Sequence, residues 1–191
     1  MEKSAVQVLS RPQEGMLETA RQVALVVGAS AFVAICAWKG SISLMPLTPV
    51  PLTLQNFAVL LVGLALGSRR GFAAMMLYLV AGMSGLPIFS PAGPGGVTQL
   101  FGVTGGFLLA YPFVSFVAGA IYERGTGSFA RAALSALAAE VLLFASGLTW
   151  LYALTHSMAR AAYFGLYWFI AGEVIKIMLA AGIASRWRRT K

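Results

Sequence analysis

Apolar and polar positions alternate in long blocks along this chain. Six runs of mainly apolar residues, each 15 to 25 residues long, are separated by segments rich in charged residues, glycine or proline. About 20 apolar residues are needed for a helix to cross a bilayer core roughly 30 Å thick. We therefore predict an all-α integral membrane protein with six transmembrane helices, over Val23–Trp38, Thr53–Gly67, Gly71–Gly85, Gly105–Tyr122, Ala130–Leu154 and Ala161–Ser185.

The polar residues divide the chain into three parts. Residues 1–22 form a charged N-terminal segment that leads into the first helix, residues 23–185 form the six-helix membrane domain, and residues 186–191 form a basic tail. We expect the first helix to be retained, because its charged lead is long and no clear processing site follows it.

Two of the connecting segments differ from ordinary solvent loops. The proline-rich segment Ser41–Leu54 and the glycine-rich segment Leu86–Thr104 contain large apolar residues, among them Leu44, Phe89 and Phe101. The neighbouring run Gly71–Gly85 has 15 residues, and a helix of that length is roughly 22 Å long. Non-helical backbone at membrane depth is tolerated where it lines a cavity. The pattern favours an outward-facing ligand pocket capped by both segments, with plain solvent loops as the alternative.

Composition and charge support a membrane location and set the orientation. Hydrophobic residues make up 59% of the chain and charged residues 10%, with a mean hydropathy of +0.80. Of the 14 basic residues, 11 lie on the side that holds both termini. The positive-inside rule therefore predicts cytoplasmic termini, and we expect a multi-pass protein of the bacterial cytoplasmic membrane. The net charge of +8 suggests membrane lipid as a partner, and not nucleic acid, because the basic residues stand in short clusters between apolar runs.

Few residues are available for chemistry. The chain has one histidine, one cysteine and no aspartate, and no P-loop sequence occurs in it. We therefore predict no catalytic residues, no metal site and no cofactor. Any use of ATP requires another subunit. A structural helix bundle without a ligand is a further alternative, for which the two connecting segments are unnecessarily elaborate.

Two charged residues inside the last run are the strongest candidates for ligand contact. Glu173 and Lys176 are three residues apart and so share one face of a helix. Charges at the bilayer centre cost about 2.5–3.5 kcal/mol and usually face an interior or a ligand. An ion pair that only compensates itself is the alternative. Glu140, in the fifth run, could answer Lys176, be protonated, or contact a group outside this sequence.

At these residues the chain resembles the BioY family, the biotin-capturing S components of energy-coupling factor transporters. The similar stretches are PVPLTLQ at 49–55, GLALGSRRG at 63–71, GLPIF at 85–89, GVTGGF at 102–107 and GEVIK at 172–176. The last stretch has Glu173 where the family usually has aspartate. The longer carboxylate should keep its role as an acceptor while moving it by about one methylene.

The resemblance implies a six-helix fold that binds biotin and works with a transmembrane coupling protein and two ATPase subunits. It also implies that small residues on the first helix, Ala20 and Ala24, contact the coupling protein, although internal packing explains them equally well. The ureido group of biotin suits a carboxylate and an ammonium placed together. An S component or a stand-alone carrier for another vitamin is the alternative. The candidate ligand-binding residues are Gln55, Phe89, Thr104, Gly105, Gly106, Glu173 and Lys176.

Overall fold

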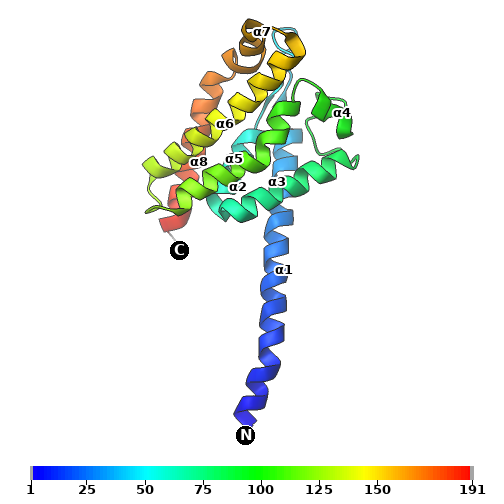
Figure 1. Cartoon of the computed structure of the whole chain (residues 1–191). Helices are drawn as coiled ribbons and strands as arrows, with labels where there is room; N and C mark the ends of the chain where they lie inside the picture. The colour runs from blue at the N-terminus through cyan, green and yellow to red at the C-terminus, as the bar shows by residue number, and fades with distance from the viewer. Residues whose placement is uncertain (1, 190–191) are drawn as a thin grey trace.

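The chain folds into a bundle of helices (Figure 1). The structure is a computed structural model that describes the backbone of residues 2–189 and the side chains of residues 15–187. Within that range the elements follow in the order α1 (Glu2–Lys39), β1 (Ser41–Ile42), β2 (Leu52–Thr53), α2 (Gln55–Leu66), α3 (Ser68–Met83), α4 (Gly96–Phe101), α5 (Gly105–Glu123), α6 (Phe129–Thr155), α7 (Met158–Ala162), the π-helix η1 (Tyr163–Tyr167) and α8 (Ile170–Arg189).

Three of these helices are long and apolar enough to cross a membrane, over Gly15–Lys39, Gly105–Glu123 and Phe129–Thr155. A fourth span results if Met158–Tyr167 and Ile170–Trp187, which are bent by 45°, are counted together. Helix α2 is apolar but has 12 residues, which is a length of roughly 18 Å. The structure thus bears out a multi-pass helical membrane protein, while the six-span count stays a prediction.

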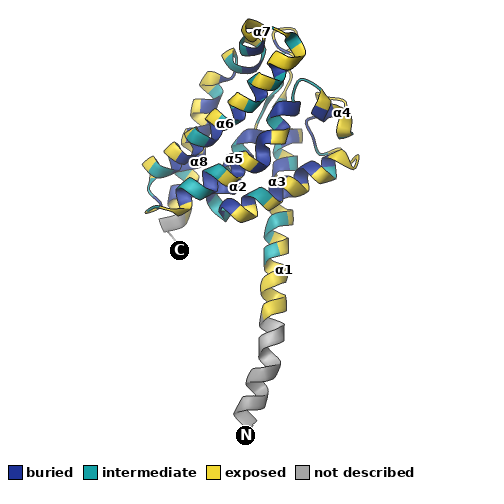
Figure 2. Cartoon of the chain, in the orientation of Figure 1, coloured by how far each residue is buried: buried dark blue, intermediate teal, exposed yellow. Residues whose placement is uncertain are grey.

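The exposed surface fits a lipid environment. Large apolar side chains such as Phe113, Leu134 and Ile175 are exposed on the outside of the bundle, and exposed and buried positions alternate along α3, α5 and α6 (Figure 2). The start of α1 and the end of α8 lie toward the same end of the molecule, away from α4 and α7 (Figure 1). Helix α1 runs without a break into the segment that we expected to precede the first helix.

Helices α2 and α3 follow each other with a single residue between them. Gly67 there has φ +87°, a conformation that favours glycine. The Glu123 carboxylate at the end of α5 accepts hydrogen bonds from the Ser68 backbone N–H and from its hydroxyl, each at 2.9 Å. Because the first N–H groups of a helix have no intrahelical partner, this contact caps α3 from another helix.

Helices α5 and α6 pack against each other at the centre of the bundle. Helix α6 begins after Ser128, whose side chain accepts from the Arg131 N–H, and ends at His156 in the left-handed conformation. The main apolar core lies where α2, α3 and α5 meet, and its fully buried side chains include Leu60, Met75 and Val114.

The last apolar run, which we predicted as one helix over Ala161–Ser185, is interrupted. Helix α7 passes into η1, and α8 begins at Ile170. The Phe164 carbonyl in η1 accepts a hydrogen bond from the Thr48 hydroxyl at 2.7 Å. The Thr48 side chain, from a distant segment, thus bonds to a backbone carbonyl inside this run. The apolar pattern could not indicate such a contact.

The two connecting segments have some regular structure of their own. Strands β1 and β2 pair antiparallel, with Ser41 opposite Thr53, so the described residues are not wholly α-helical as predicted. The glycine-rich segment contains α4, and the Trp150 indole N–H donates to the Gly102 carbonyl at 2.9 Å. The Ser41 and Ser90 hydroxyls lie 2.8 Å apart and join the two segments.

Candidate functional site

A pocket lies between the helices and beneath the two connecting segments. The proline-rich segment, the glycine-rich segment and helices α2, α5, α6 and α8 all supply lining residues, and η1 supplies Gly165. Segments far apart in the sequence therefore form one site.

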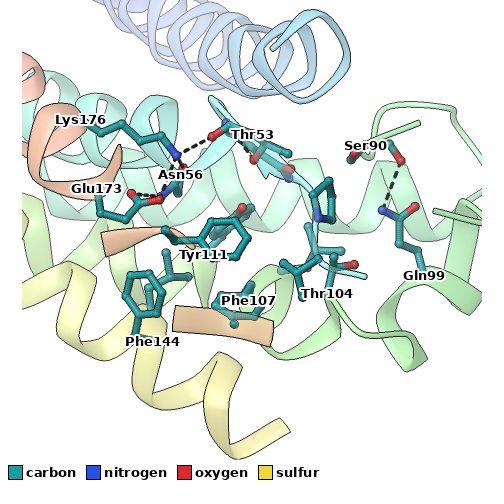
Figure 3. Close-up of a pocket in the computed structure, with 17 residues that line it drawn as sticks. Thr53, Asn56, Ser90, Gln99, Thr104, Phe107, Tyr111, Phe144, Glu173 and Lys176 are labelled. Carbon is teal, nitrogen blue, oxygen red and sulfur yellow. Dashed lines mark hydrogen bonds and ion pairs between the residues drawn. The ribbon is translucent and has the colours of Figure 1, made fainter. Parts of the chain in front are cut away.

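A cluster of hydrogen-bonded polar side chains forms one end of the pocket (Figure 3). Lys176 Nζ donates to Glu173 Oε1 at 2.9 Å, to Asn56 Oδ1 at 2.9 Å and to the Thr53 carbonyl at 2.6 Å. The Asn56 amide nitrogen donates to Glu173 Oε2. Glu173 is 5% exposed and Lys176 7%. The predicted pair is therefore a buried, hydrogen-bonded ion pair, and an ammonium with three acceptors has used all its donors.

Glu140 stands behind this cluster on α6. Its Oε1 accepts from the Asn56 amide nitrogen at 3.3 Å, whereas its Oε2 has no hydrogen-bond partner among the described residues. Glu140 is 3% exposed and is absent from the pocket lining. It therefore contacts Asn56, which lines the pocket, and it lies beside Glu173.

The middle of the pocket is apolar and its far end is polar. Phe107, Tyr111, Phe144 and Phe169 supply aromatic walls, and the Phe107 and Phe144 rings meet edge to face with centroids 6.1 Å apart. Figure 3 shows the Ser90–Gln99 contact at the opposite end from the Glu173–Lys176 pair, with the aromatic residues between them. The Gln99 amide donates to the Ser90 carbonyl at 3.4 Å. The site thus has a charged end, an apolar centre and an uncharged polar end.

Hydrogen bonds attach the segments above the pocket to the helices. The bond from Lys176 to the Thr53 carbonyl joins α8 to strand β2. The Gln55 amide donates to the Tyr78 hydroxyl at 2.8 Å, and that hydroxyl donates to the Ile88 carbonyl at 2.9 Å. Residues of the charged end and of α2 therefore help to fix the position of both segments.

Of the seven residues predicted to contact ligand, four line this pocket: Gln55, Thr104, Glu173 and Lys176. Phe89 packs edge to face on Tyr78, with ring centroids 5.4 Å apart. A Cβ at Gly105 would collide with the Leu100 carbonyl, and one at Gly106 with Trp150. These three residues shape the packing around the pocket and are not on its wall, and their contact with ligand stays a prediction.

The sequence reasoning missed several pocket residues, above all Asn56. It follows Gln55 in the PVPLTLQN stretch, and a polar residue in an apolar run was the signal that could have identified it. The aromatic wall residues carry no such signal, because Phe107, Tyr111 and Phe144 look like ordinary core residues in an apolar helix.

The fold and the pocket define a helical membrane protein with a buried small-molecule site. Comparison with known proteins then gives the family. Residues 5–191 match the BioY family. The chain is 35% identical over 167 residues to a protein of Pyrococcus horikoshii named "Probable biotin transporter BioY", covering 87% of this chain and 96% of that one. It is 36% identical to the "Biotin transporter BioY" of Thermotoga maritima, covering 84% and 91%. The chain belongs to the BioY family, which confirms the resemblance seen in its motifs.

A solved structure agrees in fold. The crystal structure of an S-component for biotin from an ECF-type ABC transporter superposes with a TM-score of 0.81 and covers 90% of this chain and 93% of that chain, at 23% sequence identity. This likeness supports the S-component fold for this chain.

Proposed function

We propose that this protein captures biotin in the described pocket, as the substrate-binding component of an energy-coupling factor transporter. The observation that carries the proposal is the buried Glu173–Lys176 pair with Asn56 at one end of an otherwise mostly apolar pocket. The relatives' names support biotin as the substrate. Transport proteins, and not enzymes, are the class to which these relatives belong.

The charged end offers partners for a ureido ring, which has two N–H donors and one carbonyl acceptor. Each Glu173 oxygen accepts one hydrogen bond from the protein. Because a carboxylate oxygen has two lone pairs, both oxygens can also accept a ureido N–H. Lys176 has used its three donors. It must therefore release one protein acceptor to bind the ureido carbonyl, and the Thr53 carbonyl, which belongs to the proline-rich segment, is the acceptor that we expect to be released.

The rest of the pocket suits the rest of the molecule. The thiophane ring and aliphatic chain would lie against Phe107, Tyr111 and Phe144, and the carboxylate end would face Ser90 and Gln99. Apolar walls with a few placed polar groups are typical of small-molecule sites. This orientation uses the polar groups at both ends of the pocket.

The membrane arrangement is part of the proposal. We infer six spans, with α2 and α3 each crossing as a short helix, and both termini in the cytoplasm of a cell whose cytoplasmic membrane holds the protein. The basic clusters at 69–70, 124–131 and 186–191 support this orientation. The relatives include an archaeal protein, so their similarity does not restrict the location to bacteria. A coupling membrane protein and two ATPases would supply energy.

Ala20 and Ala24 are exposed on α1, where small side chains allow another helix to approach. If they contact the coupling protein, Ala20→Trp or Ala24→Trp should reduce uptake and co-purification of the coupling subunits while leaving biotin binding intact. Unchanged co-purification would contradict this contact.

The binding proposal is tested by calorimetry on the detergent-purified chain. Biotin should give saturable heat and raise the melting temperature, whereas riboflavin and thiamine should do neither and should not compete. Heat from one of those vitamins and none from biotin would contradict the assignment. For orientation, a single cysteine at either terminus of a Cys36→Ala background should escape an impermeant thiol reagent in intact cells.

A further inference from the structure

Glu140 is a buried ionisable residue that the proposed binding mode leaves without a role. It is 3% exposed, and its neighbours within the cluster are Asn56 from α2 and the Glu173–Lys176 pair from α8. The Tyr111 hydroxyl group from α5 also lies near it. Lys176 supplies the positive charge of this cluster, and Glu140 and Glu173 are both potential negative charges.

The hydrogen bonds show that the Lys176 ammonium pairs with Glu173 and not with Glu140. All three Lys176 donors go to Glu173 Oε1, Asn56 Oδ1 and the Thr53 carbonyl, and none goes to Glu140. An ionised Glu140 would have one amide donor at 3.3 Å for Oε1 and, within the part of the chain that the structure describes, no donor for Oε2. Burying a charge with so few partners is costly, and such groups take up a proton instead. If Glu140 and Glu173 were both ionised, the two carboxylates would also have to share the Asn56 amide nitrogen as a donor.

We propose that Glu140 carries a proton in the folded protein and acts as a positioning residue for Asn56. The cluster then consists of one ion pair and one neutral acid, with no net charge. The Glu140 Oε1 holds one Asn56 N–H while Glu173 holds the other, so Asn56 Oδ1 faces Lys176. The Asn56 amide is thereby fixed in one orientation at the pocket wall. The expected effect on biotin affinity rests on the proposed function, whereas the protonation of Glu140 does not depend on it.

The test compares the same substitution at two neighbouring carboxyl groups. Glu140→Gln keeps an acceptor for Asn56 and replaces the acid hydroxyl by an amide donor, so biotin affinity should stay within about threefold of wild type. Glu173→Gln replaces an ionised acceptor, so affinity should fall by roughly ten- to a hundredfold. Glu140→Leu removes the acceptor for Asn56 and should weaken binding while Glu140→Gln does not. An equal loss in the two glutamine variants would overturn the proposal.

The proton is measured separately in the ligand-free protein. Infrared spectra at neutral pH, in a detergent without ester groups, should contain the carbonyl band of a protonated carboxylic acid that shifts in D₂O. The band should vanish in Glu140→Gln. Absence of the band in wild type, or its loss in Glu173→Gln alone, would refute a protonated Glu140. If biotin does not bind, the proposed function is refuted, but the spectrum still shows whether Glu140 is protonated.

Discussion

Helices α2 and α5 meet in different ways at their two ends. At one end Gly63 lies against the backbone of Ser115, and Gly119 lies against Gly67 and Ser68. At the other end Asn56 of α2 and Tyr111 of α5 line the pocket. Asn56 and Gly63 are seven residues apart, and Tyr111, Ser115 and Gly119 are spaced by four, so each set shares one helix face.

The side chains on one face thus decide whether two helices touch or leave a cavity. Where the residues are glycine and serine, no Cβ can be added at Gly63 without colliding with the Ser115 carbonyl. Two turns further along, polar and aromatic side chains surround the ligand space. The closed end brings the two helices into contact, and the open end surrounds the proposed binding site. Substitutions at the two ends should therefore differ in what they damage.

The largest effect is expected at the open end from Lys176→Met. The change removes three hydrogen bonds and leaves the buried Glu173 carboxylate without its countercharge. Breaking a buried pair on one side costs about 3–5 kcal/mol. The melting temperature should fall steeply and biotin binding should be lost, as measured by thermal unfolding in detergent and by calorimetry.

The double variant Glu173→Gln plus Lys176→Met sharpens that result. Because both charges are removed, stability should recover toward wild type. Biotin affinity should not recover, since the groups that would contact the ureido ring are gone. Recovery of both properties would mean that the pair only compensates itself.

At the closed end, Gly63→Ala should damage stability and spare ligand affinity. The new methyl group meets the Ser115 carbonyl, and overpacking of this kind costs about 1–3 kcal/mol. Gly182→Ala in α8 is the matched control, because a Cβ there meets none of the described residues within 4 Å. Thermal unfolding should give a lower melting temperature for the first variant and no decrease for the second. Equal melting temperatures would show that α2 and α5 are not in backbone contact.

The smallest effect is expected above the open end, from Ser41→Ala. The substitution removes the hydroxyl contact between Ser41 and Ser90 that joins the two connecting segments. A hydrogen bond of this kind contributes about 0.5–1.5 kcal/mol. Biotin should dissociate a few times faster from this variant in a chase experiment. The exposed Ser43 of the same segment serves as control, and an equal change in Ser43→Ala would argue against a role for the Ser41–Ser90 contact.

The sequence by itself determined the class of protein, most of the helices and the charged pair. A buried core helix needs fewer apolar residues than these blocks contain, so membrane spans are the main interpretation left. A glutamate and a lysine three residues apart must share a helix face. The motifs at 49–55, 85–89, 102–107 and 172–176 indicated the family that the comparisons then established.

The tertiary structure alone decided which residues meet. Asn56 and Glu140 are 84 positions apart in the sequence, and no local pattern joins them. At η1 the Phe164 carbonyl accepts a hydrogen bond from the Thr48 hydroxyl, 116 residues away. Phe89, Gly105 and Gly106 stand in the motifs but are not among the residues that line the pocket, because a motif gives a position in the chain and not the direction in which the side chain points. Contacts across such distances depend on how the helices pack, which a periodic pattern along one helix does not contain.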